Sequence, residues 1–293
     1  MKQRSIHHIQ RGFSLIELMI SLAIGLLILA AVAVVYQSSS RTSRISESDT
    51  TLNEEGLIAL SILQQQLRQA GYFRPSGAGG NDPRNFTGAA IRACDGGFVV
   101  KNAAFDALAC NGGTGSDAIA IRYEANAFNT VQSGGNPVNC TGAAIATGFA
   151  SNNRGTPFTM ADNRYFIGNN NLSCQGATSP LTFDNAAQAL MANVEDLQLR
   201  FGVTTTADFN DNQIIDYLNA SEIADADWGR VVSVQICVLM HSTRQSNRDL
   251  TETAQAYRDC RGRETTSTDG LTRRSYITTV ALRNRTSVPT TIE

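Results

Sequence analysis

An acidic stretch in the second half of the chain has side chains whose type and spacing could bind a metal ion. Asp208, Asn210 and Asn212 place oxygen-bearing side chains at alternate positions. The backbone carbonyl of Ile214 and the carboxylate of Asp216 continue this series. Alternation lets a tight loop direct successive oxygens at one hard cation, and oxygen ligands are those that Ca²⁺ prefers. The stretch therefore predicts a calcium site, and no other cofactor is expected.

The same stretch resembles the start of an EF-hand or dockerin-like loop, with two departures. Gln213 stands where such a loop has glycine, and Asn219 stands where a bidentate glutamate is expected. Glu222 could supply that glutamate if the loop were longer. A solvated Asp/Asn turn between strands explains these residues without a metal.

Six cysteines occur in the chain, and their pattern favours disulfides over metal or redox chemistry. None of them forms a CxxC pair, and no His/Cys group has zinc spacing. An even count downstream of a membrane segment is typical of an oxidising compartment, although free buried thiols are the alternative. Six cysteines allow fifteen full pairings. We expect neighbours in sequence to pair: Cys94 with Cys110, Cys140 with Cys174, and Cys237 with Cys260.

Residues suited to catalysis or to nucleic-acid binding are scarce. Past residue 12 the single histidine is His241, at the end of a predicted strand, and neither a GxSxG motif nor a Walker loop is present. The net charge is -2, and residues 1–12 contribute three positive charges to it. Nine arginines lie between Arg244 and Arg285, but no dense basic run or aromatic interleaving accompanies them. We expect neither an enzyme nor a nucleic-acid partner.

The N-terminus combines a short basic segment with a long apolar one. Residues 1–12 are polar and basic, whereas Phe13 to Tyr36 contains a single ionisable residue, Glu17. At about 1.5 Å per residue this apolar segment spans roughly 36 Å, enough to cross a bilayer with some tilt. The positive-inside rule keeps the basic segment in the cytoplasm. The apolar stretch is longer than that of an ordinary secretory signal and lacks an A-x-A site, and a plain signal anchor does not explain Glu17.

The sequence RGFSLIELMIS, residues 11–21, resembles the processing site of type IV pilins and type II secretion pseudopilins. The resemblance implies that a membrane prepilin peptidase cleaves between Gly12 and Phe13 and then N-methylates Phe13. It also implies that Glu17 pairs with the Phe13 amine of a neighbouring subunit during assembly. A bare carboxylate in a membrane costs a few kcal/mol, so a positive partner would stabilise it. Glu17 is near enough to the cytoplasmic end to snorkel to the interface in the monomer.

Apolar or small residues continue at helical spacing beyond the membrane segment. No proline precedes Pro75, and Gly71 is a natural C-terminal cap. We therefore expect one helix over 13–71, with the transmembrane part at about 13–36, and a β-rich globular domain over 72–293 that follows the cleaved leader 1–12. The helical stripe should pack on that domain; it comprises Ile45, Leu52, Gly56, Leu60, Leu63, Leu67 and Ala70.

Alternating and apolar segments predict strands in the remainder of the chain. Residues 74–116 and 125–180 read mainly as loop. The predicted fold is α+β and pilin-like: a long N-terminal transmembrane helix packed on an antiparallel β-sheet globular domain. The expected strands lie at 117–124, 165–168, 192–203, 230–242 and 275–285.

Three later segments resemble the PilW-like minor pilins in their order: VEDLQLRFGV, WGRVVSVQICVLMHS and YITTVALRNR. This resemblance implies a structural subunit that primes type IV pilus assembly and lies at or near the fibre tip. It also implies a role in twitching motility, which depends on these pili. Implied partners are the prepilin peptidase/methylase, other minor pilins, the major pilin, the inner-membrane assembly platform and a tip adhesin. The implied location is the inner membrane, crossed once, with a periplasmic domain, and then the fibre. Alternatives are a J-like type II pseudopilin and a calcium-dependent tip adhesin or DNA-uptake module.

Overall fold

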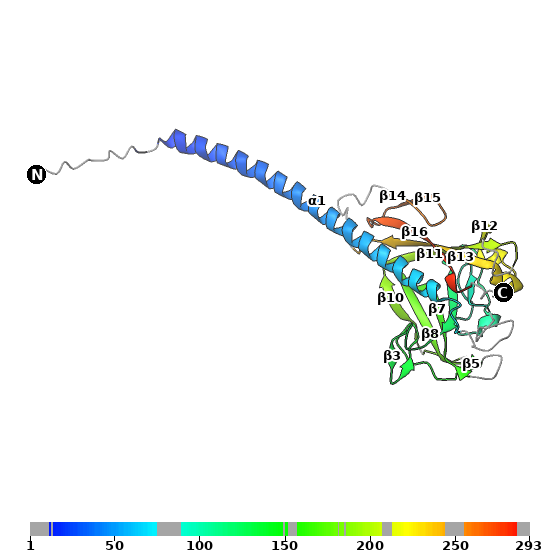
Figure 1. Cartoon of the computed structure of the whole chain (residues 1–293). Coiled ribbons are helices and arrows are strands. Elements are labelled where there is room, and N and C mark those ends of the chain that lie inside the picture. Colours follow the sequence, from blue (N-terminus) through cyan, green and yellow to red (C-terminus); the bar gives the residue numbers. More distant parts are fainter. Residues whose placement is uncertain are drawn as a thin grey trace, which may run out of the picture. The chain divides into compact units, whose positions relative to one another are not determined.

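The computed structural model shows one long helix followed by a β-rich region (Figure 1). It divides into two compact units, Met1–Glu47 and Ser48–Glu293. Helix α1, Leu15–Gln69, contributes to both, so each unit is described by itself. The described residues are 12, 14–74, 89–148, 150–151, 157–180, 182–184, 186–206, 213–243 and 255–285.

Local signals define both ends of α1. The carbonyl of Ser14 accepts a hydrogen bond from the backbone N–H of Leu18 at 3.1 Å, which places a serine at the favoured N-cap position. Glu17 lies in the first turn, where the helix dipole favours a negative charge. After Gln69 the chain turns at Gly71, whose φ of 73° is left-handed and suits glycine. The helix was expected over 13–71, and α1 runs from Leu15 to Gln69.

A six-stranded antiparallel sheet occupies the first part of the globular unit. Its order is β1-β2-β7-β8-β10, with β9 paired to β8. The strands are β1 (Ile91–Cys94), β2 (Ala118–Glu124), β7 (Met160–Gly168), β8 (Asn171–Ser179), β9 (Thr182–Phe183) and β10 (Gln188–Ala192).

The hairpin of β7 and β8 corrects the expectation of loop over 125–180 with one short strand at 165–168. Both strands have nine residues, and Asn169 and Asn170 connect them with φ values of 52° and 56°. Two successive left-handed residues form the turn that suits a two-residue hairpin. The prediction failed because β8 is rich in small polar residues, so its apolar alternation is weak. Its residues are nevertheless buried or half-buried.

A four-stranded antiparallel sheet completes the framework, in the order β12-β11-β13-β16. Three of its strands lie where alternation predicted them: β11 (Val194–Thr204), β13 (Val231–His241) and β16 (Arg273–Ala281); β12 (Ile214–Leu218) is added at one edge. The remaining elements are short. They are η1 (Phe105–Ala107), η2 (Ala220–Glu222), η3 (Asp225–Arg230), η5 (Arg283–Arg285) and the strand pairs β3 (Gln132–Ser133) with β4 (Asn136–Pro137), β5 (Ala150–Ser151) with β6 (Pro157–Phe158), and β14 (Gln255–Arg258) with β15 (Glu264–Ser267).

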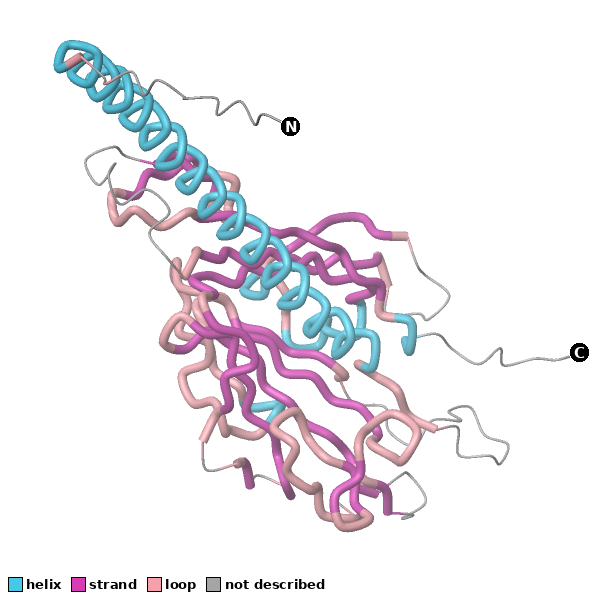
Figure 2. The backbone as a smooth tube through the Cα atoms, turned by 90° about the vertical axis from the view of Figure 1, so that its left-hand side faces the viewer, coloured by secondary structure: helices cyan, strands magenta, loops and turns pink. Residues whose placement is uncertain are grey.

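The main hydrophobic core contains residues of the second half of α1 and of both larger sheets. In the backbone view of Figure 2, this half of the helix runs beside strands. It includes Leu63 of the helix, Tyr165 of the six-stranded sheet and Phe201 of the four-stranded sheet. The two sheets are also linked by Asp117, whose carboxylate accepts hydrogen bonds from the backbone N–H groups of Gly96 at 3.2 Å and Leu199 at 2.8 Å. Burial raises the pKa of the Asp117 carboxyl to about 7.

All three disulfides expected between neighbouring cysteines are formed. Cys94 bonds to Cys110, Cys140 to Cys174 and Cys237 to Cys260, with Cα atoms 5.0, 6.3 and 5.5 Å apart. The first holds residues 95–109 as a loop whose Phe98 and Phe105 form a second, smaller core with Ala118, Ala120 and Phe166.

Candidate functional site

Gly12 lies in open surroundings. A Cβ added at this glycine would meet no heavy atom of the described residues within 4 Å. Packing within the chain therefore does not require glycine at this position. Residues 1–11 and Phe13 lie outside the described residues, so cleavage between Gly12 and Phe13 and methylation of Phe13 remain predictions.

Glu17 is exposed at the start of α1. Its backbone carbonyl accepts a hydrogen bond from Ser21 Oγ at 2.7 Å. This contact involves the main chain of Glu17 and not its carboxylate. Over the described ranges, no hydrogen bond or ion pair involves the Glu17 carboxylate. A carboxylate in an otherwise apolar stretch is a group that a positive partner would stabilise.

The first part of α1 exposes apolar side chains on every side. An 18-residue window of this helix has a mean hydropathy of 2.9 with none of it buried, so the helix is long and apolar enough to cross a membrane. Soluble surfaces rarely leave such a large apolar area uncovered, and lipid or other apolar chains would cover it. Exposed fractions run from 52% to 79% among Leu15, Ile16, Leu18, Met19, Ile20, Leu22, Ile24, Leu26, Leu27, Ile28, Leu29, Val32, Val34, Val35 and Tyr36.

The second part of α1 is attached to β16 through specific contacts. A Cβ at Gly56 would lie 2.3 Å from the Tyr276 ring, so only glycine allows this close approach. The Tyr276 hydroxyl donates to the Leu52 carbonyl at 3.0 Å. Gln64 Nε2 donates to Thr278 Oγ1 at 2.6 Å. The helical stripe identified Gly56 and Leu52, whereas no sequence signal indicated their partners on β16.

The predicted calcium site falls mostly outside the described residues. Asp208, Asn210 and Asn212 are not described, and Ile214 and Asp216 lie in β12. Calcium therefore stays a prediction. Where side chains are described, no group of three His, Cys, Asp or Glu residues is arranged to hold a metal.

The two residues considered for completing that loop have structural roles. Asn219 is the N-cap of η2, and Glu222 Oε2 accepts a hydrogen bond from the Asn219 backbone N–H at 2.7 Å. The Glu222 carboxylate therefore closes a capping box. His241, the other residue considered for chemistry, makes a contact of 3.0 Å from Nδ1 to the Ser242 carbonyl oxygen.

Two family models match separate regions of the chain. Residues 8–33 match the prokaryotic N-terminal methylation motif, which includes Gly12, Phe13 and Glu17. Residues 159–284 match the family described as type IV pilus-assembly protein W, a region that runs from β7 to β16. The chain is therefore similar to PilW and to the type IV pilins in these two regions. Its motif and apolar helix indicate membrane anchoring and association with the pilus.

A solved structure similar to this PilW-like chain is a type IV-like pilin from Thermus thermophilus. The two share 12% identity over 80% of this chain and 97% of the other, with a TM-score of 0.41. None of the curated proteins compared with the chain matches it.

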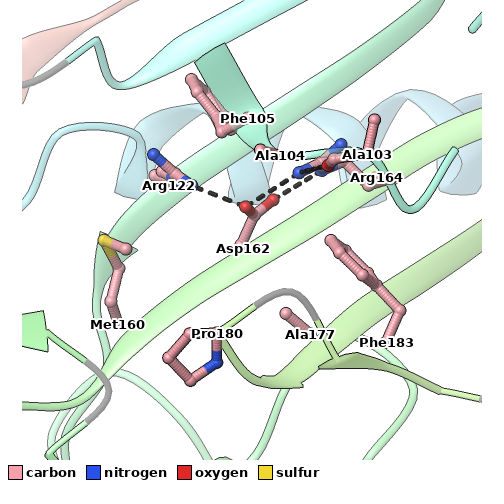
Figure 3. A pocket seen from close by; sticks show the side chains of 10 residues that line it. All are labelled: Ala103, Ala104, Phe105, Arg122, Met160, Asp162, Arg164, Ala177, Pro180 and Phe183. Carbon is pink, nitrogen blue, oxygen red and sulfur yellow. Dashed lines mark hydrogen bonds and ion pairs between the residues drawn. The ribbon is translucent and has the colours of Figure 1, made fainter. Parts of the chain in front are cut away.

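The PilW-like chain has a second site, an ion cluster on the outer face of its six-stranded sheet (Figure 3). Asp162 on β7 accepts hydrogen bonds from Arg164 Nε at 2.6 Å and Nη2 at 2.9 Å, and from Arg122 Nε at 3.1 Å. Burial lowers the pKa of the Arg122 guanidinium, and the neighbouring Asp162 carboxylate opposes that shift. A cavity of about 140 Å³ lies beside the cluster. Sequence reasoning missed this site because Arg122 lies on β2, and only the strand register brings it beside Asp162 and Arg164 on β7.

Proposed function

We propose that this chain is a minor pilin that primes assembly of a type IV pilus and is incorporated at or near the fibre tip. The observation that carries the proposal is the uncovered apolar surface of α1, most of which lies within the region that matches the methylation motif. A surface of this kind needs lipid first and neighbouring pilin helices afterwards. No proline precedes Pro75. This favours a minor subunit, because many major pilins carry a proline midway through the membrane stretch.

Cleavage and assembly are coupled through charge. Removal of the leader creates an amine on Phe13, and the Glu17 carboxylate has no described partner in the monomer. In the low dielectric of a membrane or helix bundle, this carboxylate and the Phe13 amine of a neighbouring subunit would neutralise each other. The basic leader keeps the N-terminus cytoplasmic, so the globular unit is periplasmic before it joins the fibre.

The work of the protein under this proposal is packing and partner binding, without turnover of a substrate. Its partners are the prepilin peptidase/methylase, the assembly platform of the inner membrane, other minor pilins, the major pilin and a tip adhesin.

Glu17→Gln tests the assembly step because it keeps size and polarity but removes the charge. We expect normal processing and membrane insertion, with loss of the variant from sheared fibres measured by immunoblotting. Glu47→Gln is the matched control, since Glu47 is an exposed carboxylate on the same helix and beyond the apolar stretch. Incorporation of Glu17→Gln at the level of the control would refute the pairing.

A J-like pseudopilin of type II secretion is the alternative that the shared processing motif supports. Deletion of the gene separates the two. Loss of surface pili and twitching with normal exoprotein secretion supports the minor pilin, whereas the reverse supports the pseudopilin.

Calcium is a separate proposal that rests on Asp208, Asn210 and Asn212. Calorimetric titration of the detergent-solubilised chain with Ca²⁺ tests it, and Asp208→Asn together with Asn210→Ala should abolish the heat. Absence of both heat and thermal shift in the unaltered chain would exclude the site and the calcium-dependent adhesin with it.

A further inference from the structure

Three charged side chains lie together on the outer face of the six-stranded sheet. Arg122 on β2 is paired in register with Asp162 on β7, and Arg164 follows two residues later on the same face. The loop closed by Cys94 and Cys110 carries Phe105, and the Arg122 guanidinium carbon lies 4.0 Å from the centre of that ring. The side chains of Arg164, Asp162 and Arg122 are only 0%, 4% and 14% exposed.

The cluster holds more positive than negative charge. Asp162 is the single carboxylate in hydrogen-bond contact with the two arginines. Asp106 is 74% exposed, and its nearest oxygen is 3.9 Å from Arg122 Nη1, too far for a hydrogen bond. Among the described residues, Arg122 thus shares Asp162 with Arg164 and is paired with Asp106 only at this longer distance, so a further anion close to its guanidinium would be attracted to it.

The two arginines differ in how many of their donors are used. Arg164 donates from Nε and Nη2 to Asp162, and from its terminal nitrogens to the carbonyls of Lys101 and Ala103. Arg122 donates from Nε alone; among the residues that the structure describes, none accepts a hydrogen bond from Arg122 Nη1 or Nη2. Two terminal guanidinium nitrogens form a fork that matches the two oxygens of a carboxylate.

The cavity next to this fork is mostly apolar. Arg122 lines one side, and Met160, Pro180 and Phe183 line the other (Figure 3). Its volume is about 140 Å³. A cavity of about this size holds a benzene-sized molecule. The lining thus combines a cationic donor pair with room for one compact apolar group.

We propose that this pocket binds a small monocarboxylate with a compact apolar group, its carboxylate on the Arg122 fork and its apolar part against Met160, Pro180 and Phe183. Nothing in pilus processing or assembly requires such a ligand, so the site adds a binding function to the globular unit.

The test uses 4-fluorobenzoate as the probe and the full chain in detergent micelles. Binding is followed by ¹⁹F NMR, with 4-fluorobenzyl alcohol as the neutral analogue. We expect saturable binding of the carboxylate, and binding of the alcohol weaker by roughly tenfold or more, because a charge-assisted hydrogen bond is lost. Non-saturable partition, or equal binding of both probes, would overturn the proposal.

Four variants locate the site. Arg122→Gln should weaken binding roughly tenfold or more, whereas Arg200→Gln, the matched control, should leave it unchanged, because Arg200 is exposed and donates to the Tyr217 carbonyl. Asp106→Asn should tighten binding by roughly twofold to tenfold, since it removes a competing negative charge. Ala104→Leu should block binding by filling the cavity.

The last two variants keep the test decisive if Arg122→Gln fails to fold, because neither Asp106 nor Ala104 belongs to the buried ion cluster. Unchanged affinity in both would refute the assignment. Inorganic phosphate is the final probe: if it competes as well as benzoate, the apolar wall is not used and the proposed ligand class is wrong.

Discussion

The two parts of α1 illustrate how one helix can be built for two surroundings. From Leu15 to Tyr36 nearly all residues are apolar and exposed, with Glu17 as the one charge. From Leu52 to Leu67 only a stripe is buried, and glycine is placed where an aromatic ring approaches. The membrane compatibility of the first part therefore depends on its overall hydropathy. The packing of the second part depends on which residue stands at each position. The same substitution should therefore destabilise the globular unit when it is made in the second part and leave its stability unchanged when it is made in the first.

Leucine truncation should give the largest contrast. Leu63 is 1% exposed within the main core, so Leu63→Ala should lower the free energy of unfolding of the globular unit by about 2–5 kcal/mol. Leu22→Ala, at a leucine that is 59% exposed, should leave it unchanged. Denaturant titration in detergent measures both, with fluorescence of the single tryptophan, Trp228, as reporter. Equal destabilisation by the two variants would remove the contrast.

The two glycines of the helix should differ in the same way. Gly56→Ala places a Cβ against the Tyr276 ring, whose hydroxyl is itself bonded to the helix, and should cost about 1–3 kcal/mol. Gly25→Ala meets nothing within 4 Å among the described residues and should not destabilise the protein. Thermal unfolding of both variants in one detergent measures the difference. A neutral Gly56→Ala would show that the helix can move away from β16.

A polar contact should contribute less. Gln64→Ala removes the hydrogen bond to Thr278 and should cost about 0.5–1.5 kcal/mol. Gln37→Ala is the control, because Gln37 is an exposed residue in the other part of α1. The same denaturant titration applies, and a cost as large for Gln37→Ala would contradict the assignment of this contact.

The smallest effect should be a pH dependence at high pH. Burial raises the pKa of Tyr276, which favours its neutral form in the folded state. The unfolded tyrosine ionises near pH 10, so the contribution of Tyr276 is present below about pH 10 and is lost as pH rises through the higher folded pKa. Between about pH 9 and pH 11 the unaltered chain should therefore lose more stability than Tyr276→Phe. An equal loss of unfolding free energy in the two proteins would argue against a contribution of Tyr276 ionisation.

The sequence predicted features that a local pattern encodes. The stripe from Leu52 to Leu67 marks the buried face of α1, and Gly71 marks its end. Alternation located β2, β11, β13 and β16. The motif around Gly12 and Glu17 predicted a processing and assembly segment, and this stays a prediction. Among the described residues, no contact within the chain accounts for the glycine or for the carboxylate.

Features that depend on distant pairing were not predictable in this way. The β7–β8 hairpin has polar residues that are buried because the sheet is covered on both faces, although Asn169-Asn170 was a turn signal that could have indicated it. The ion cluster requires the register that sets Arg122 beside Asp162, forty positions away. No periodicity within a single strand contains that information.

The disulfides have a further consequence for how the chain matures. They close successive loops with separations of 16, 34 and 23 residues, and no loop contains a cysteine of another pair. If the residues after the membrane segment cross in sequence order, both partners of each bond would arrive before the first cysteine of the next pair. Oxidation in order of arrival then selects one pairing out of fifteen, without a step of disulfide isomerisation.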